Sequence, residues 1–236
     1  MGMDTAMTAE LTLIRLMAWL SPGFPVGAYA YSQGIEQAVE AGPIADAEAL
    51  TDWVGAAIAH GPGRLDADLF RMAWQAVEGD DVAALHAAAE HAALLRGSAE
   101  LALESSAQGA AFRRAVTESW PSPAASLWLA RLAQSPRQPS YAIAVGTVCA
   151  AAGLALRPSL AAFLHAQAAN LVSAGVRLIP LGQTQGQRAL AALESTVLEA
   201  VEASLVRSEA DIGSATPLID LCSMLHETQY TRLSRS

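Results

Sequence analysis

The sequence contains no lysine, and its 14 strongly basic side chains are all arginines. A P-loop needs a lysine on the β and γ phosphates of a nucleotide, and a Schiff-base enzyme needs an amine nucleophile. Both enzyme classes are therefore excluded. Charge is also sparse, at 16% of residues with a formal net charge of −9. Such a chain has no basic field to attract a phosphate backbone, so nucleic acid is not an expected partner.

Cysteine is scarce, since only Cys149 and Cys222 are present. They lie far apart and match no paired-cysteine metal motif, so we expect reduced thiols in the core of a cytoplasmic protein. The first residues lack a positively charged region, and Arg15 interrupts the apolar run that follows, which argues against a cleaved signal peptide. Residues 138–156 and 158–176 are uncharged and long enough to cross a bilayer. Their richness in alanine, glycine and polar residues favours buried helices and no membrane, although a membrane-associated helical protein remains a rival interpretation.

Alanine dominates most segments, and apolar residues recur at helical spacing, which predicts an all-α fold. Asp46 is expected to cap a helix that ends at His60, and the next helix is expected to begin at Asp66 or Asp68. A long amphipathic helix is expected over residues 190–205. The inner face of the first of these helices is formed by Leu50, Trp53, Val54, Ala57 and Ile58.

The breaks between these segments contain proline or glycine and are short. We therefore predict a single multi-helix bundle domain with short connections over residues 1–236. Residues 1–9 are expected to be disordered, and residues 226–236 to form a C-terminal docking tail.

Nothing in the sequence resembles an active site or a preformed metal site. No Gly-x-Ser-x-Gly motif occurs, so a nucleophile elbow is not predicted. His86 and His91 are five residues apart, which places them on different sides of a helix. His86 and Glu90 have the i, i+4 spacing of an imidazole–carboxylate pair, for which a surface pair is favoured over a transient contact with a metal ion. We therefore predict no catalytic, cofactor-binding or metal-binding residues.

Two segments call for more than a structural explanation. Residues 20–36 contain two prolines and several glycines, which predict a rigid, irregular corner that feeds aromatic side chains into the next helix. Residues 226–236 become basic and polar at the end of an acidic chain. They could form a frayed terminus or a docking segment anchored by Tyr230, Arg232 and Arg235.

Four ordered blocks resemble those of the urease accessory protein UreF family. The first runs from Ser21-Pro22-Gly23-Phe24-Pro25-Val26-Gly27 to Tyr31-Ser32-Gln33-Gly34-Ile35-Glu36, and the second is Ala174-Gly175-Val176-Arg177-Leu178-Ile179-Pro180-Leu181-Gly182-Gln183. The other two are Asp211-Ile212-Gly213-Ser214-Ala215-Thr216-Pro217 and His226-Glu227-Thr228-Gln229-Tyr230. Ala102 stands where the family usually has arginine, and Ser234 stands where it usually has phenylalanine. Loss of a guanidinium and a phenyl ring puts particular partner contacts in doubt.

The resemblance implies an all-α, cytoplasmic homodimer that is not an enzyme. Such a protein would bridge UreD, also called UreH, and the GTPase UreG on apo-urease during GTP-dependent nickel insertion. Nickel and GTP would then be handled by the partner proteins, and the chain would need no cofactor. The alternative is a protein that activates or regulates GTP hydrolysis by UreG, for which an arginine at the nucleotide would be required.

The resemblance also implies partner-binding residues in three groups. The corner supplies one group and the C-terminal tail another, the latter for docking to UreD. The second block, residues 174–183, is called the central block below. For its residues, Pro180 and Gly182 included, a role in the core or in a dimer contact is as well supported as a contact with UreG. The predicted partner-binding residues are Pro25, Gly27, Tyr31, Ser32, Gln33, Glu36, Arg177, Gln183, His226, Glu227, Tyr230, Arg232 and Arg235.

Overall fold

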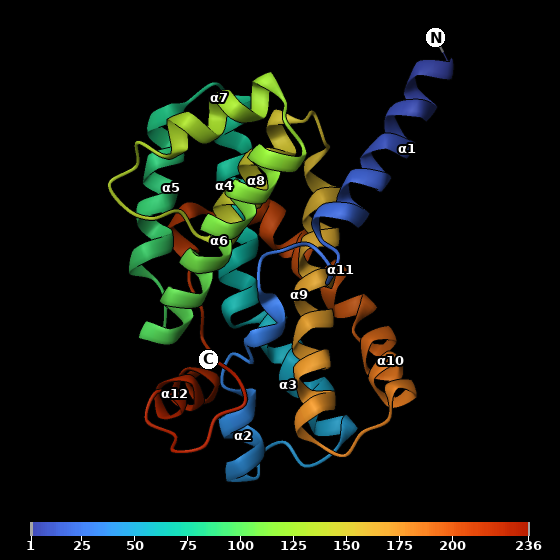
Figure 1. Cartoon of the computed structure of the whole chain (residues 1–236), viewed down its shortest axis with the longest axis vertical. Coiled ribbons are helices and arrows are strands. Elements are labelled where there is room, and N and C mark those ends of the chain that lie inside the picture. Colours follow the sequence, from blue (N-terminus) through green and yellow to red (C-terminus); the bar gives the residue numbers. More distant parts are fainter. Residues whose placement is uncertain (1, 236) are drawn as a thin grey trace.

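The computed structural model describes the backbone of residues 2–235 and the side chains from Glu10 onward, and every regular element in this range is a helix (Figure 1). The predicted all-α fold is therefore confirmed. The elements in chain order are α1 (Gly2–Trp19), η1 (Ala28–Ala30), α2 (Ile35–Ala41), α3 (Ala47–Ala59), α4 (Pro62–Glu78), α5 (Val82–Leu94), α6 (Ala99–Ser119), α7 (Pro123–Leu132), α8 (Tyr141–Ala151), α9 (Leu156–Leu178), α10 (Gln183–Ala192), α11 (Glu194–Val206), η2 (Glu209–Asp211) and α12 (Pro217–His226).

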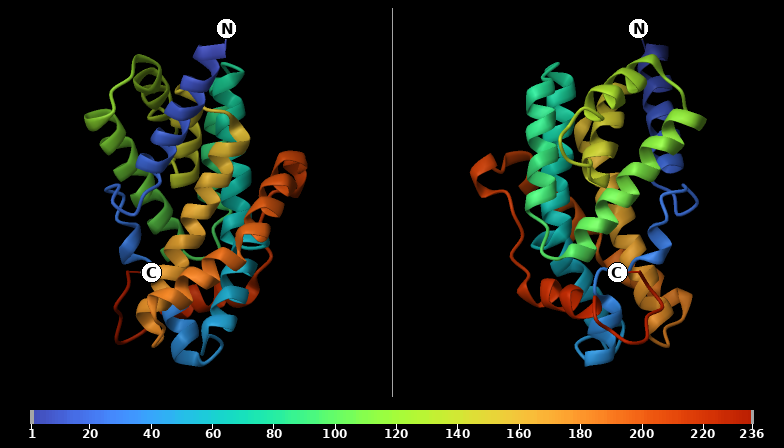
Figure 2. Two further views of the ribbon diagram at one scale, coloured as in Figure 1. Left: turned by 90° about the vertical axis from the view of Figure 1, so that its right-hand side faces the viewer. Right: turned by 60° about the vertical axis from the view of Figure 1, so that its left-hand side comes forward.

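The centre of the bundle is the contact between α4 and α8, which α5, α6, α7 and α9 surround (Figures 1 and 2). All residues of α8 from Ala142 to Ala150 are buried. At Gly146 the two helices approach so closely that an added Cβ would lie 2.5 Å from the carbonyl oxygen of Phe70. Glycine is therefore needed at this crossing, because any side chain would force the backbones apart.

A row of aromatic rings connects the corner after α1 to this centre. Adjacent ring centroids lie 5.2 to 5.8 Å apart, within the range of favourable aromatic pairs. The rings come from the corner, α6, α8, α9 and α4, so they tie segments from distant parts of the sequence to one core. In spatial order they are Phe24, Phe112, Tyr141, Phe163 and Phe70.

Helix α3 agrees with the prediction, whereas the start of α4 does not. The Asp46 carboxylate accepts the backbone N–H of Ala49 at 2.9 Å, and the predicted inner face of α3 is buried. Helix α4 begins at Pro62 rather than at Asp66 or Asp68, because proline suits the first turn of a helix. Both aspartates lie deeper in α4 and form buried ion pairs, Asp66 with Arg96 and Asp68 with Arg207.

The single helix predicted over residues 190–205 is wrong, because the chain forms α10 and α11 with a break at Leu193. Leu193, Val197 and Val201 are nevertheless buried. The apolar spacing continues across the break, so periodicity alone could not locate it.

Three other expectations concern the ends and the uncharged stretches. Helix α1 includes most of residues 1–9, but side chains are described only from Glu10, and disorder there stays a prediction. Both cysteines are free and buried, as predicted. The uncharged stretches form α8 and α9, and no helix in the described part of the chain is long and apolar enough to span a membrane.

Candidate functional site at the C-terminal network

The corner between α1 and α2 depends on glycine at two positions. Gly27 has φ of +76° and Gly34 has φ of +80°, a backbone region that L side chains rarely adopt. An added Cβ at Gly34 would also lie 2.7 Å from the backbone nitrogen of Ser223, so α12 packs directly on the start of α2. Pro25 and Gly27 are exposed, whereas Tyr31 and Ser32 are buried.

Gln33 connects this corner to α6. Its backbone has φ of +53°, which is unusual for a residue other than glycine. The Gln33 Nε2 atom donates to Glu104 Oε1 at 3.1 Å, and the same oxygen accepts from Gln108 Nε2 at 2.9 Å. The strained residue is therefore held by a polar contact with a second element.

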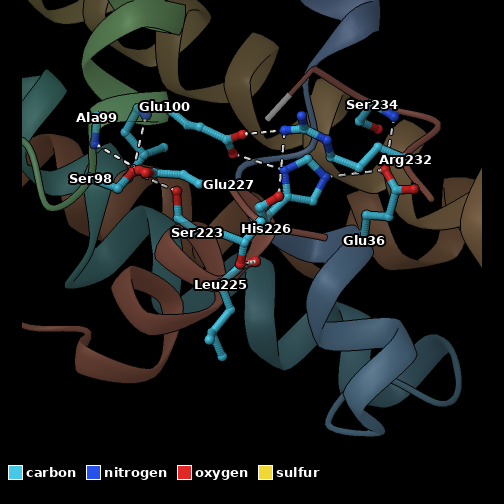
Figure 3. A network of polar contacts seen from close by, with 12 residues as sticks. Glu36, Ser98, Ala99, Glu100, Ser223, Leu225, His226, Glu227, Arg232 and Ser234 are labelled. Atoms are coloured by element: carbon cyan, nitrogen blue, oxygen red, sulfur yellow. Dashed lines mark hydrogen bonds and ion pairs between the residues drawn. The ribbon is translucent and has the colours of Figure 1, made fainter. Parts of the chain in front are cut away.

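A cluster of polar contacts surrounds His226, the fully buried last residue of α12 (Figure 3). Its Nδ1 atom lies 2.8 Å from Glu100 Oε2, and its Nε2 atom lies 3.4 Å from Glu36 Oε2. Arg232 Nη1 donates to the other oxygen of Glu100 at 2.8 Å. Both ring nitrogens of His226 and one guanidinium nitrogen of Arg232 thus face the carboxylates of Glu36 and Glu100.

Glu36 also binds the backbone of the C-terminal tail (Figure 3). Its Oε1 accepts the N–H of Leu233 at 2.6 Å, and its Oε2 accepts the N–H of Ser234 at 2.8 Å. Burial by itself raises the pKa of this carboxyl, but the bonds from Leu233, Ser234 and His226 outweigh it, so the pKa of Glu36 is lowered. We call Glu36, Glu100, His226, Arg232 and the two tail N–H groups the C-terminal network.

Further bonds fix the segment on either side of this network. Glu227 accepts the backbone N–H of Ala99 at 3.2 Å, which satisfies one of the free donors at the start of α6. Gln229 donates to Glu40 at 2.5 Å, and the backbone N–H of Arg235 donates to the carbonyl of Ala30 at 2.7 Å. Residues 227–235 therefore lie against α2, α6 and η1.

The central block reaches the corner through Arg177. Its Nη2 atom donates to the carbonyl of Tyr29 at 2.9 Å, and the guanidinium lies 3.9 Å from the centroid of the Tyr29 ring. Gln183, by contrast, is exposed at the first residue of α10, and the contacts described for the network do not include it. Pro180 and Gly182 are also exposed, before α10 begins.

The structure thus gathers most of the predicted partner-binding residues around the starts of α2 and α6. Within the chain His226 binds two carboxylates, and Arg232 binds Glu100. Among the predicted anchors, the side chain of Tyr230 is fully exposed. A partner-binding role of these residues stays a prediction.

Sequence analysis missed Glu100 and Leu233. Glu100 lies in the first turn of α6, where an acidic residue is favoured in any helix, so the sequence gives no sign of its contact with His226. Leu233 is 81% exposed although its N–H is bound. At the departure at Ser234, both the backbone N–H and the side chain of this residue bond to Glu36, and both bonds lower the pKa of that carboxyl. Ala102 is partly buried on α6.

A second polar cluster, in which Asp66 binds Arg96 and Gln167, lines a cavity of about 520 Å³ beside α1, α6 and α9. The described residues hold no group of three histidine, cysteine, aspartate or glutamate side chains suited to a metal ion. The predicted surface pair of His86 and Glu90 differs from the observed contact, in which His86 Nε2 lies 2.9 Å from the carbonyl oxygen of Arg131. The C-terminal network is therefore our candidate site, and what it binds in the structure is the chain's own tail.

The fold and this site define an all-α protein that orders its C-terminal segment on the surface of a helical bundle. A sequence profile of the UreF family matches residues 44–194. A urease accessory protein UreF from Rhodopseudomonas palustris strain HaA2 is 50% identical over 95% of this chain and 94% of its own length. Proteins of the same name from Granulibacter bethesdensis and Bradyrhizobium sp. strain ORS 278 are 46% and 47% identical over 98% and 97% of this chain, and 97% and 94% of their own lengths. The chain belongs to the UreF family.

Proposed function

We propose that the protein is a non-catalytic scaffold in urease maturation. It joins UreD (UreH) and the GTPase UreG on apo-urease, so that nickel is inserted in a GTP-dependent step. The observation that carries this proposal is the C-terminal network, which holds a basic tail in one conformation and leaves Tyr230 and Leu233 exposed. Exposed tyrosine and leucine on a fixed backbone suit protein binding, because little conformational entropy is lost on contact.

The composition supports this division of labour. The chain has no lysine, so nucleotide binding by a P-loop belongs to a partner. We assign nickel and GTP to the partner proteins and place the complex in the cytoplasm, where free buried thiols such as Cys149 and Cys222 are stable.

The proposed homodimer is supported by the apolar surface of α1. Leu13, Ile14 and Met17 are each more than half exposed. Leu13 and Met17 line a cavity of about 520 Å³ between α1, α6 and α9. Apolar surface of this kind is usual at an interface between subunits. We expect Met17→Glu to convert the dimer to a monomer, as measured by light scattering.

The test of the scaffold is urease activity and bound nickel in cells that express urease, UreD, UreG and the remaining accessory proteins under limiting nickel. Omission of this chain should leave urease synthesised but poor in nickel, and co-expression should restore it. Equal activity and nickel content with and without the chain would reject the proposal.

A second test concerns the tail itself. Deletion of residues 227–236 should abolish co-purification with UreD and leave helicity, measured by circular dichroism, unchanged. Undiminished complex formation by the truncated chain would remove the tail from the proposal. A regulatory role on UreG would replace the scaffold role if Arg177→Ala changed UreG turnover much more than UreG binding.

A further inference from the structure

The cavity of about 520 Å³ between α1, α6 and α9 has walls of different character. Helix α1 contributes apolar side chains such as Leu16 and Met17, and α9 contributes small ones such as Ala162 and Ala166. Its volume lies in the range of sites that bind small organic molecules. The cavity is therefore large enough for a ligand with an apolar body.

The wall that α6 contributes is polar although it is buried. Leu101, Glu104, Ser105 and Gln108 are spaced as i, i+3, i+4 and i+7, so they share one face of α6, and all four are buried and line the cavity. The buried face of a helix ordinarily carries apolar residues, and here only Leu101 is apolar. Because buried polar side chains cost stability unless they are hydrogen-bonded, this wall indicates a role beyond packing.

Gln33, whose side chain also lines the cavity, adds backbone strain beside this wall. Its φ of +53° is rare for a residue other than glycine, and its Nε2 atom donates to Glu104 Oε1 at 3.1 Å. Strained backbone of this kind is concentrated at sites that bind ligands.

Three buried polar atoms have no hydrogen-bond partner within the described residues, and all three belong to side chains that line the cavity. They are Ser105 Oγ, Arg96 Nε and Gln167 Oε1. Ser105 is 8% exposed, and the side chain of Arg96 is 5% exposed. Arg96 and Gln167 are neighbours, because they donate to the two carboxylate oxygens of Asp66 at 2.5 and 2.7 Å. A ligand that supplies the missing bonds would remove the cost of leaving these atoms unpaired.

The three unpaired atoms define the head group of such a ligand. Arg96 Nε is a donor, Gln167 Oε1 is an acceptor, and the Ser105 hydroxyl can be either. A carboxylate cannot donate to Gln167, and an ammonium group cannot accept from Arg96. An amide does both, through its carbonyl oxygen and its N–H, and it brings no charge to a wall where Asp66 is already paired with Arg96.

We propose that this cavity binds an amphipathic small molecule with an aliphatic body and a neutral amide head group. The amide carbonyl accepts from Arg96 Nε, and the amide N–H donates to Gln167 Oε1. The Ser105 hydroxyl makes a further bond to the head group, and the aliphatic body lies against α1 and α9. This inference goes beyond the proposed function and is independent of it, because no partner protein takes part in the binding.

The first experiment tests the head group with hexanamide as the probe. It is titrated into the full-length protein and followed by ligand-observed NMR, and we expect saturable binding. Hexanoate lacks a donor, hexylamine in its charged form lacks an acceptor, and N,N-dimethylhexanamide lacks the N–H. Each should bind at least about tenfold more weakly than hexanamide. Absence of saturable hexanamide binding would overturn the site, and equally tight binding of any of the other three would overturn the amide head group.

The second experiment tests the location with variants whose folding is checked by circular dichroism. Ser105→Ala removes an unpaired hydroxyl and should weaken hexanamide binding about three- to tenfold. Ser106→Ala is the matched control on the same helix, because the Ser106 hydroxyl already donates to the carbonyl of Leu103. Ala166→Leu narrows the cavity and should abolish binding, whereas Ala191→Leu, at an exposed position on α10, should leave it unchanged.

Two results of this second experiment would contradict the proposal. Wild-type affinity in Ser105→Ala would place the probe away from the polar wall, and this variant decides the question even if Ala166→Leu does not fold. Loss of hexanamide binding as the protein concentration rises and dimers form would mean that a second copy of the chain covers the cavity, which would also overturn the ligand site.

Discussion

Helices α4 and α12 differ in which side chains they bury, because α4 buries charged residues and α12 exposes apolar ones. The 17-residue α4 is buried on most sides and carries Asp66, Asp68 and Arg71 into the interior, where distant elements supply their partners. The 10-residue α12 buries four residues and exposes its leucines. Buried ion pairs such as Asp66–Arg96 and Asp68–Arg207 favour one arrangement of the bundle, whereas exposed apolar surface indicates a contact with another protein. We therefore distinguish two parts of the molecule. The frame is α4 with the helices packed on it, α5, α8 and α9, and the docking end is α12 with the tail, residues 227–235.

The largest expected effect is at the centre of the frame. Phe70 is fully buried, and its ring lies 5.2 Å from that of Phe163. We expect Phe70→Ala to lower the free energy of unfolding by about 3–5 kcal/mol in urea titrations, because it leaves a cavity between α4 and α9. Leu127→Ala, at an exposed position on α7, is the control and should change stability by less than about 1 kcal/mol. Similar losses for the two variants would contradict the central position of α4.

The second-largest loss of stability is expected when a buried ion pair of the frame is broken. Asp68 accepts from Arg207 at 2.8 and 2.9 Å and from Ser204 at 2.9 Å, and its side chain is fully buried. Asp68→Ala should destabilise the protein by about 3 kcal/mol or more, because it leaves a largely buried guanidinium without its counter-charge. The exposed pair of Arg157 and Glu202 provides the control, since Glu202→Ala should cost less than about 1 kcal/mol. Chemical denaturation of both variants measures the difference.

At the docking end we expect a local effect. Glu36→Gln replaces one of the two acceptor oxygens by a donor, so one of the bonds to Leu233 and Ser234 is lost. Docking of the tail should weaken by about 1–3 kcal/mol, while the bundle keeps its stability. Carboxypeptidase should then remove the last residues faster from this variant than from the wild type or from Glu48→Gln, which changes an exposed acid on α3. Equal trimming of all three would mean that Glu36 does not hold the tail.

Acid should release the tail in a related way, with no effect near neutral pH and a growing effect at low pH. The pKa of Glu36 is lowered from its ordinary 4.5 when the tail is bound, so the ionised form stabilises the bound tail. This contribution is complete above pH 4.5 and is lost as the pH falls through the lowered pKa. Tail mobility, followed by NMR relaxation, should therefore rise only on the acid side of that value. A rise that begins near neutral pH would point to a different titrating group.

Local sequence signals predicted some elements of the fold and not others. Local signals predicted α3 correctly, because the Asp46 cap and the apolar spacing lie within a few turns of each other. They failed at α4, where Asp66 and Asp68 look like helix caps but pair with arginines from other elements. The break at Leu193 was missed because the apolar pattern continues through it.

The contacts of the candidate site could not be predicted from local sequence signals. Family resemblance pointed to the corner and the tail, but the contact of Glu36 with Leu233 spans 197 residues and that of His226 with Glu100 spans 126. No periodicity or spacing rule links residues at such separations. Only the packing of α12 on α2 and α6 brings them together.

The bond between Glu36 and the N–H of Leu233 also has a consequence for biosynthesis. Leu233 is made 197 residues after Glu36, so the network cannot close until the ribosome has synthesised the tail. The helical bundle, in contrast, has most of its core residues before α12 is made. A chain that stops before the tail would therefore keep most of the bundle core and still lack the segment proposed to recruit UreD, which restricts assembly to chains that contain the tail.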